Sequence, residues 1–387
     1  KVLERIHQCG IVGLGGATFP TARKIGAGAA KIRVLIINGV ECEPYLTGDD
    51  RLMRERSDEI LSGAQILADT FGIPSLLWAI EDDKPAALKA TLSVASREPR
   101  LQVRPVPTRY PQGSERQLIQ TLLKEDLPAR TPPVEVGILC QNVATLAAIH
   151  QAVILGRPLI SRIVTVSGSM IAHPANFETR IGTPVEFLIE KAGGLKSDTA
   201  DLIVGGPMTG KRPPSLKWPI SKSTLGVIAL PTVNPWHQET QEMPCIRCGE
   251  CAQICPQNLL PQSLLWHGSK DQIKELNALH LMACIECGCC DWVCPSRIPL
   301  TPLFKELKQA VRREDRKRLM ADRSLWRHEA RLARLNRENL EKAEAAKSRK
   351  IALESGALKI QDALDRAQRK RQARLGKEAD LGEESPP

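Results

Sequence analysis

The sequence predicts an α/β protein followed by a small α+β module, a cysteine-rich segment and a basic helical tail. Three observations lead to this prediction. Strand and helix patterns alternate through residues 34–155, and eight of the twelve cysteines fall in two short motifs near residues 245–294. Beyond about residue 305 the composition shifts to Arg, Lys, Glu, Ala and Leu, which is typical of a long solvated helix.

The 387 residues suggest two to four domains, and a hydrophobic content of 42% is ordinary for a soluble protein. No run of about eighteen apolar residues occurs, so we expect no transmembrane helix. The chain begins at Lys1 inside a helix pattern, which suggests a fragment or a processed product. Basic residues exceed acidic ones by eight from Lys305 onward, so most of the net charge of +10 belongs to the tail.

Residues 34–155 contain apolar strand patterns that alternate with helical spacing of apolar residues. Strands are expected at 34–37, 75–80, 101–106 and 134–139, with helices at 57–72, 84–95, 114–125 and 143–153. Such alternation predicts a mostly parallel sheet covered on both faces.

Residues 160–212 follow a different pattern. A β-branched strand at 162–167, a helix from Thr183 to Gly193-Gly194 and a strand at 202–204 suggest a small α+β module. An edge of the preceding domain is an equally weighted alternative. We expect a domain at 1–158, a module at 159–215, a linker at 216–238, a cysteine domain at 239–304 and a tail at 305–387 that becomes disordered at Glu383–Pro387.

The cysteines repeat the spacing of bacterial ferredoxins twice. The motifs are Cys245-x-x-Cys248-x-x-Cys251-x-x-x-Cys255-Pro256 and Cys284-x-x-Cys287-x-x-Cys290-x-x-x-Cys294-Pro295. Three closely spaced thiolates can occupy three corners of one cubane, whereas the fourth cysteine lies too far along the chain and binds the other cluster. We therefore predict two [4Fe–4S] clusters. Cluster one would take Cys245, Cys248, Cys251 and Cys294, and cluster two Cys284, Cys287, Cys290 and Cys255.

Zinc is the main alternative, but zinc sites usually take two Cys-x-x-Cys pairs per ion. Cys289 is either a substitute ligand or, more simply, a bystander, and Cys9, Cys42 and Cys140 are expected to be buried free thiols. Clustered cysteines favour metal binding in a reducing compartment, hence a cytoplasmic location.

A glycine-rich loop, Gly13-Leu14-Gly15-Gly16-Ala17-Thr18-Phe19-Pro20, lies near the start of the chain. It fails the dinucleotide fingerprint, because Thr18 replaces the third glycine and the loop follows a helix. Its amides could still bind a phosphate with help from Lys24. A plain tight loop is the alternative.

With Thr21-Ala22-Arg23-Lys24, this loop resembles the flavin loop of the NADH-binding (51 kDa) subunit of respiratory complex I. Four further stretches follow in the same order as in that family: Asn38-Gly39-Val40-Glu41-Cys42-Glu43-Pro44, Tyr110-Pro111-Gln112-Gly113-Ser114-Glu115, Asn142-Val143-Ala144-Thr145-Leu146, and the module at 160–212, which resembles its β-grasp domain. The two clusters and the basic tail resemble the C subunit of the Rnf (also Rsx) electron-transport complex. The resemblance implies a Rossmann-like flavin and NADH domain, a β-grasp module of SLBB type and a helical ferredoxin-like domain.

The resemblance also implies cofactor contacts. FMN would be bound by Gly13, Gly15, Gly16, Lys24, Asn38, Asn142 and Thr145. The NADH side would be lined by Phe19, Glu41, Glu43, Tyr110, Gly113 and Glu115. Val40 and Ser114 stand where the family has acidic residues, which affects nucleotide contacts more than the flavin pocket.

The implied function is electron entry: NADH would reduce FMN, and FMN would pass electrons to the two clusters. Hydride transfer requires no acid–base residue, so none is assigned as catalytic. Expected partners are the iron–sulfur B subunit and the membrane subunits of the complex, and a ferredoxin-type acceptor, at the cytoplasmic face of the bacterial inner membrane. The alternatives are a soluble flavin reductase, such as a cobalamin reductase, and an iron–sulfur carrier without flavin.

Basic clusters in the tail include Arg312-Arg313, Arg316-Lys317-Arg318, Arg349-Lys350 and Arg369-Lys370-Arg371. A solvated helical extension explains them most simply. Binding to an anionic membrane or to an acidic partner subunit is the next interpretation. Nucleic acid is disfavoured because no aromatic residues are interleaved with these clusters.

Overall fold

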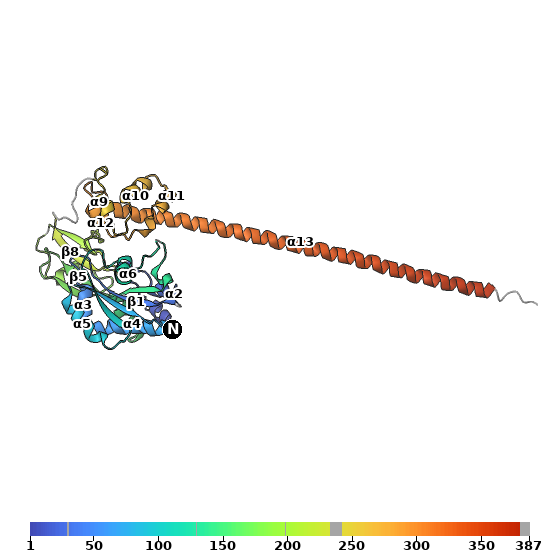
Figure 1. Ribbon diagram of the computed structural model, residues 1–387, viewed down its shortest axis with the longest axis horizontal. Coiled ribbons are helices and arrows are strands. Elements are labelled where there is room, and N and C mark those ends of the chain that lie inside the picture. Colours follow the sequence, from blue (N-terminus) through green and yellow to red (C-terminus); the bar gives the residue numbers. More distant parts are fainter. Residues whose placement is uncertain (29–30, 129, 198, 233–241, 380–387) are drawn as a thin grey trace, which may run out of the picture. The chain divides into compact units, whose positions relative to one another are not determined.

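The computed structural model describes residues 1–387 except 29–30, 129, 198, 233–241 and 380–387 (Figure 1). The chain divides into a compact unit, Lys1–Val311, and a second unit, Arg312–Pro387. The compact unit contains two four-stranded sheets and a group of short helices that carries the cysteine motifs.

The first sheet is wholly parallel and has the strand order β3-β2-β1-β4. Its strands are β1 (Val34–Gly39), β2 (Leu76–Glu81), β3 (Leu101–Val106) and β4 (Ile138–Asn142). From β1 the chain adds β2 and β3 on one side and then returns to add β4 on the other. The strand order therefore reverses between β1 and β4, and ligands of open α/β sheets bind at such a switch point.

Helices cover both faces of this sheet. Successive strand residues point to opposite faces, so each face carries apolar side chains that must be buried. The helices are α1 (Val2–Gln8), α2 (Thr21–Gly26), α3 (Gly48–Glu55), α4 (Ser57–Phe71), α5 (Pro85–Ala95), α6 (Glu115–Leu123) and α7 (Val143–Val153). Leu35, Ile37 and Trp78 pack into one core with residues of α4 and α7. Ile36 lies in a second core on the opposite face, together with Leu118 of α6.

The predicted parallel sheet is confirmed, with one shift in its last strand. A strand was expected at 134–139, but Pro133–Val136 forms a 3-10 helix and β4 begins only at Ile138. Gly137 separates the two with a φ of 84°, a left-handed conformation that interrupts an extended chain.

The second sheet forms the predicted α+β module and has the order β6-β5-β8-β7. Its elements are β5 (Ser161–Ser167), β6 (Ala175–Arg180), α8 (Val185–Lys191), β7 (Ala200–Val204) and β8 (Gly226–Pro231). The central strands β5 and β8 are parallel and the outer pairs are antiparallel. Val185 and Leu188 of α8 pack against Val164 and Val227 of the sheet.

The linker expected at 216–238 is wrong for part of its length, because β8 lies within it as a central strand. Its residues Gly226–Leu230 are all buried. A strand buried on both sides has a short continuous apolar sequence without alternation, and the Pro- and Lys-rich flanks obscured it. The polar edge strand β6 was also missed.

The cysteine region folds as short helices around a small core. Its elements are α9 (Glu250–Gln253), α10 (Pro261–Gly268), α11 (Ile273–Ala278), η3 (Leu281–Ala283) and α12 (Cys289–Trp292), with the first turns of α13 (Leu300–Ala379). Leu264, Phe304, Leu307 and Val311 are buried together here. This helical domain matches the expectation.

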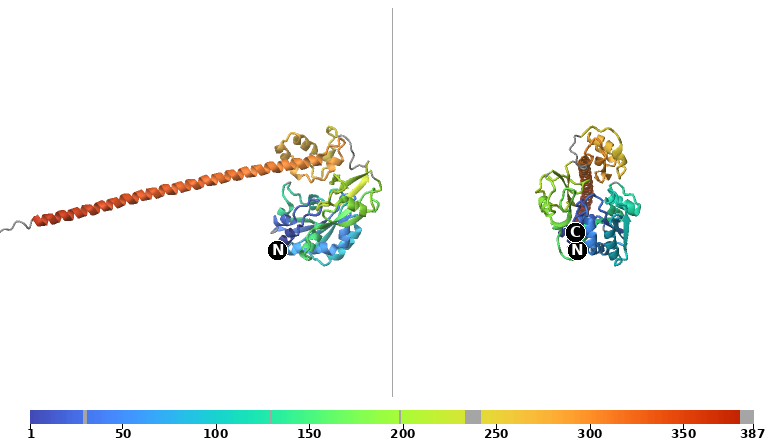
Figure 2. Two further views of the ribbon diagram at one scale, coloured as in Figure 1. Left: turned by 180° about the vertical axis from the view of Figure 1, so that it is seen from behind. Right: turned by 90° about the vertical axis from the view of Figure 1, so that its left-hand side faces the viewer.

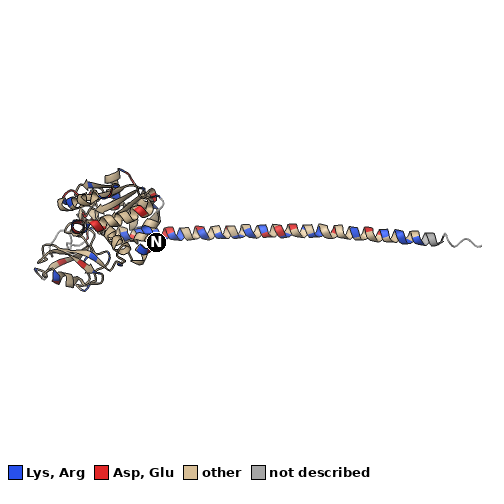
Figure 3. Cartoon of the chain, turned by 90° about the horizontal axis from the view of Figure 1, so that it is seen from below, with Lys and Arg blue, Asp and Glu red and all other residues tan. Residues whose placement is uncertain are grey.

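The second unit consists of the remainder of α13, an unbroken helix (Figure 2). Its side chains from Arg312 to Arg374 are almost all exposed, and Lys and Arg are interspersed with Asp and Glu along it (Figure 3). The helical tail is thus confirmed for the described residues, whereas the disorder predicted at 383–387 lies outside them. Among the described residues, no helix combines the length and apolar character that crossing a bilayer requires.

Candidate functional site

Two asparagines stand side by side where the first sheet reverses its strand order. Asn38 near the end of β1 is in register with Asn142, the last residue of β4. Because these are the carboxyl ends of neighbouring parallel strands, both side chains lie at the edge where ligands of such sheets bind. This edge is the candidate cofactor site.

Both asparagines already hold protein loops at this edge. Asn38 Nδ2 donates to the carbonyl oxygen of Gly113 at 2.9 Å, and Asn38 Oδ1 accepts from the amide of Val40 at 3.1 Å. Asn142 Oδ1 accepts from the amide of Ala144 at 2.9 Å and thereby caps the N-terminus of α7. The asparagines thus position the segments that surround the site.

The glycine-rich loop is anchored beside Asn142. The amide of Leu14 donates to Thr145 Oγ1 at 2.9 Å, and Thr145 is fully buried. Gly13 closes the loop internally, because its amide donates to the carbonyl of Phe19 and its carbonyl accepts from the amide of Thr18. A Cβ added to Gly15 would lie 3.4 Å from Asn142 Cβ, so the loop packs closely on the strand end.

Three consecutive amides of this loop remain available. Within the described chain, the amides of Gly15, Gly16 and Ala17 donate no hydrogen bond. Gly16 has a φ of 106°, which is accessible mainly to glycine. Successive amides in such a turn form a concavity that binds anions, so the loop fits a phosphate group. Gly13 differs from the expectation, since its amide is used inside the loop.

Lys24 and Glu115 form an ion pair rather than facing separate ligands. Lys24 Nζ lies 2.8 Å from Glu115 Oε1 and donates to the carbonyl of Cys140 at 2.7 Å. Burial lowers the pKa of Lys24, but Glu115, with a further contribution from Cys140, more than offsets this effect and the pKa is raised overall. The ammonium group is therefore firmly charged beside β4.

Three carboxyl groups gather next to the asparagines. Glu41 accepts from the amides of Asp49 and Asp50 at 3.0 and 3.1 Å, and its own amide donates to Glu81 Oε2 at 3.1 Å. Asn142 Nδ2 donates to Asp49 Oδ2 at 2.5 Å. Glu41 is thus tied to both neighbouring carboxyl groups through backbone amides.

Burial of these carboxyl groups disfavours their charged forms. Burial raises the pKa of Glu41 to about 8, with a further contribution from the charge of Asp49. Burial also raises the pKa of Asp49 to about 6 and that of Glu81 to about 7. Glu81 is 1% exposed, and its Oε1 has no hydrogen-bond partner in the described structure. The site therefore offers a buried polar atom without a partner.

Glu43 and Tyr110, expected on the NADH side, contact other parts of the chain. Glu43 Oε2 accepts from the amide of Met208 at 3.0 Å, in the loop after β7. Tyr110 Oη donates to the carbonyl of Cys287 at 2.6 Å, within the second cysteine motif. These contacts join the first sheet to the β-grasp module and to the cysteine domain.

Phe19 is 48% exposed, and the guanidinium carbon of Arg23 lies 6.0 Å from its ring centre. An exposed aromatic face at a glycine-rich loop is available for stacking against a planar ring. Its expected contact with nucleotide stays a prediction.

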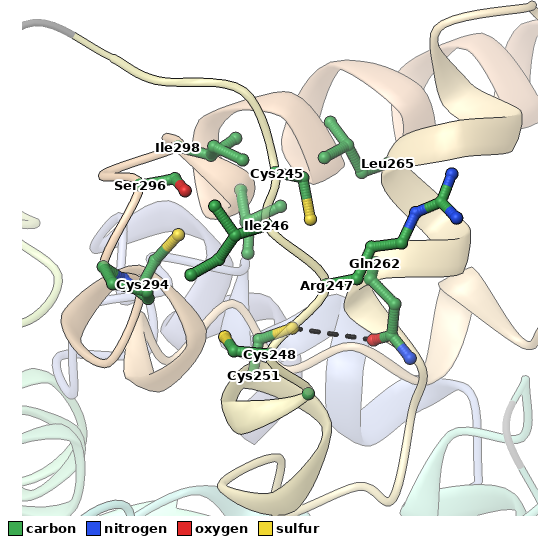
Figure 4. A pocket seen from close by; sticks show the side chains of 13 residues that line it. Cys245, Ile246, Arg247, Cys248, Cys251, Gln262, Leu265, Cys294, Ser296 and Ile298 are labelled. Carbon is green, nitrogen blue, oxygen red and sulfur yellow. Dashed lines mark hydrogen bonds between the residues drawn. The ribbon is translucent and has the colours of Figure 1, made fainter.

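The four cysteines predicted for cluster one line a single cavity. Cys245, Cys248, Cys251 and Cys294 surround it, and their sulfur atoms face the same space (Figure 4). Apolar side chains such as Leu265 and Ile298 complete the lining. The first three cysteines come from one loop and the fourth from the other motif, which is the arrangement that interleaved ferredoxin ligation requires.

The second cysteine set lies against the rest of the compact unit. Gly288 approaches the carbonyl oxygen of Met208 so closely that an added Cβ would lie 2.6 Å from it. Gln117 Nε2 donates to the carbonyl of Pro256, the residue after Cys255, at 2.8 Å. Cys289 is buried beside Cys287, where it contacts a predicted ligand.

Neither set has the geometry of a mononuclear site. Within the described ranges, no three Cys, His, Asp or Glu side chains converge on a point where one ion could bind. A zinc ion needs its donors within about 2.3 Å, whereas cubane thiolates bind different iron atoms and stand further apart. Four thiolates drawn from two interleaved motifs are a donor set that fits a [4Fe–4S] cluster.

The isolated cysteines behave largely as expected. Cys9 and Cys140 are buried free thiols, and Cys42 is half-buried and accepts from the amide of Gly113 at 3.2 Å. Burial raises the pKa of Cys42 to about 12, so this thiol is unreactive at neutral pH.

Several residues of the site were missed at the sequence level. Asp49, Glu81 and the buried Arg162, which donates to the carbonyl of Leu14 at 3.2 Å, were not singled out. Glu81 ends the buried strand β2, so its position at the strand terminus could have indicated it. Asp49 and Arg162 gave no such signal, because their contacts join distant parts of the sequence.

Family comparisons agree with this architecture. Residues 6–151 match the Nuo51 FMN-binding domain, residues 163–211 the SLBB domain and residues 244–298 the 4Fe-4S dicluster domain. Two solved structures of an NAD⁺-reducing [NiFe]-hydrogenase share the fold. The air-oxidised form has a TM-score of 0.51 and 24% identity, covering 60% of this chain and 47% of that one. The H₂-reduced form has a TM-score of 0.53 and 22% identity, covering 75% of this chain and 58% of that one.

Curated relatives are named as the C subunit of an ion-translocating oxidoreductase complex. The Pseudomonas aeruginosa protein is 48% identical, covering 88% of this chain and 44% of its own length. The Yersinia pestis protein is 42% identical, and the match covers 94% of this chain and 57% of that protein. The Haemophilus influenzae protein is also 42% identical, and the match covers 87% of this chain and 52% of that protein. The chain spans about half the length of these relatives. With the same three domains in sequence and this level of identity, the chain belongs to the family of C subunits of ion-translocating oxidoreductase complexes.

Proposed function

We propose that the chain is the electron-entry subunit of an ion-translocating membrane complex, where NADH is oxidised at FMN and electrons leave through two [4Fe–4S] clusters. The observation that carries the proposal is the direct hydrogen bond from Tyr110, at the edge of the candidate flavin site, to Cys287 in the second cysteine motif. This contact supports the proposal, because it brings a residue expected on the NADH side next to a predicted cluster ligand.

FMN supplies the change from two-electron to one-electron transfer when it is bound. The free amides of Gly15, Gly16 and Ala17 fit its phosphate, and Glu81 Oε1 is a buried acceptor without a partner among the described residues. Asn38 and Asn142 hold the loops that would enclose it. These residues orient and desolvate the site, and no proton-transferring residue is required.

The two cysteine sets differ in their surroundings, which suggests an order of electron transfer. Set two is joined to the first sheet through Tyr110 and Gln117, so cluster two would receive electrons first. In set one, Cys245 and Cys248 are exposed, so cluster one would deliver electrons to a partner.

NADH as donor follows from the resemblance to the complex I flavin subunit. The partners we propose are the iron–sulfur B subunit and the membrane subunits of the complex, with a ferredoxin-type acceptor. The relatives are named as part of an ion-translocating complex, which supports partners of this kind. We place the chain at the cytoplasmic face of the bacterial inner membrane, held there by its partners or its basic tail.

The test is direct. The purified chain is reconstituted with iron, sulfide and FMN, and bound FMN and NADH-dependent reduction of ferricyanide are measured. We expect one FMN per chain, about eight iron atoms for two cubanes, and NADH oxidation. Clusters without flavin would indicate a carrier instead. Flavin chemistry without co-purifying membrane subunits would indicate a soluble reductase.

A further inference from the structure

Lys308 is a buried ammonium group beside the second cysteine motif. It comes from the first turns of α13 and is 5% exposed. Its Nζ donates to the carbonyl of Cys284 at 2.6 Å and lies 2.7 Å from Glu286 Oε1. A buried charge requires a partner, and Glu286, which is half-buried, supplies it.

The two cysteine motifs repeat each other with a constant offset, so equivalent positions can be compared. Cys245 corresponds to Cys284, and Arg247 corresponds to Glu286. Arg247 and Glu286 share a left-handed φ of 60°, which shows that the two loops have the same local conformation.

The equivalence continues beyond the motifs. Gln262 lies 3.5 Å from Cys251 Sγ, and its equivalent Thr301 lies 3.9 Å from Cys290 Sγ. The position equivalent to Lys308 is Ser269, which carries no charge. Among the described residues, the buried ion pair therefore has no counterpart at the equivalent positions of the first motif, Arg247 and Ser269.

We propose that the Lys308–Glu286 pair sets the reduction potential of cluster two separately from that of cluster one. Reduction adds one negative charge to a cluster. A nearby cation stabilises the reduced form and raises the potential, and a nearby anion lowers it. Because Lys308 is shielded from water, its charge is screened much less than that of the exposed Arg247.

This inference rests on the proposed function, in which Cys284, Cys287, Cys290 and Cys255 bind cluster two. The pair would match the reduction potential of cluster two to that of FMN, its donor in the proposed function. Without Lys308, the remaining Glu286 carboxylate would make cluster two harder to reduce. Without Glu286, the uncompensated ammonium group would make it easier to reduce.

The experiment is an EPR-monitored redox titration of the reconstituted full chain. Lys308→Gln should lower one of the two cluster potentials and Glu286→Gln should raise the same one. Each should shift the reduction equilibrium at least tenfold, which is about 59 mV for a one-electron couple. The double variant should have a lower potential than the unchanged chain, because Lys308 Nζ also donates to the carbonyl of the predicted ligand Cys284. Arg247→Gln should affect only the other potential, and Lys317→Gln, at an exposed site on the same helix, should affect neither.

The outcomes separate the two proposals. Failure of the unchanged chain to bind two clusters would overturn the proposed function, and this inference with it. If both clusters bind but neither potential changes in Lys308→Gln or Glu286→Gln, the inference alone is overturned. The same holds if both variants shift a potential in the same direction. If Lys308→Gln fails to bind cluster two, the test uses Lys308→Arg and Glu286→Gln instead. Lys308→Arg should keep the reduction potential of cluster two, and Glu286→Gln should raise it.

Discussion

Replacing Glu41 by Gln should make the protein more stable in alkaline solution and leave it nearly unchanged in acid. Burial raises the pKa of this carboxyl from 4.5 to about 8 in the folded chain. A group with a raised folded-state pKa favours folding less and less as the pH rises from about 4.5 through about 8. A glutamine side-chain oxygen can still accept from the amides of Asp49 and Asp50, so the substitution removes the charge without removing these bonds.

The magnitude follows from the size of the pKa change. At 1.36 kcal/mol per pKa unit, the upper limit is about 5 kcal/mol. Glu41 is only half-buried and shares its field with Asp49, so we expect a gain on the order of 2 kcal/mol at pH 9. The gain should be much smaller near pH 5, which lies only slightly above the unfolded pKa of 4.5, and it should vanish below that pKa, where the carboxyl is protonated in both states.

Thermal and urea unfolding at pH 5 and pH 9 measure this difference. The matched control is Glu135→Gln, at an exposed position, which should behave alike at both pH values. A Glu41→Gln variant that gained nothing at pH 9, or that lost stability there, would contradict the assignment of Glu41 as a carboxyl penalised by burial.

Three further substitutions test other parts of the site. Gly113→Ala places a Cβ 2.4 Å from the carbonyl of Val40, so it should cost about 1–3 kcal/mol in unfolding assays and reduce bound FMN. Tyr110→Phe removes the bond to the second cysteine motif, about 1 kcal/mol, and should slow cluster reduction in stopped-flow measurements with FMN content unchanged. Cys255→Ser should lower bound iron, whereas Cys289→Ser should retain it; equal iron loss in both would make Cys289 a ligand.

The parallel sheet could be predicted because its evidence is local. Buried strands such as Leu76–Glu81 are short apolar runs, and helical spacing between them indicates the crossovers. The central strand Gly226–Pro231 was missed because it lacks alternation and lies between proline-rich segments. Secondary structure without a periodic pattern depends on the partner strand, which the sequence does not identify.

The candidate site likewise contains features that local sequence patterns predict and others that depend on distant partners. Cysteine spacing predicts ligand sets from neighbouring residues alone, and Figure 4 shows the first set around one cavity. The ion pair of Lys24 with Glu115 joins residues 91 positions apart, and the bond from Asn142 to Asp49 spans 93. Such contacts arise only when the strands are assembled, so residue-level roles at the sheet edge could not be derived from local pattern.

Rapid mixing of the reconstituted chain with NADH under anaerobic conditions tests the central claim most directly. Flavin absorbance near 450 nm and the EPR signals of reduced clusters are followed in samples frozen at increasing times. The account predicts loss of flavin absorbance first and cluster signals afterwards, from less than one equivalent of NADH. Clusters that stay oxidised while flavin is reduced, or flavin that NADH does not reduce, would contradict it.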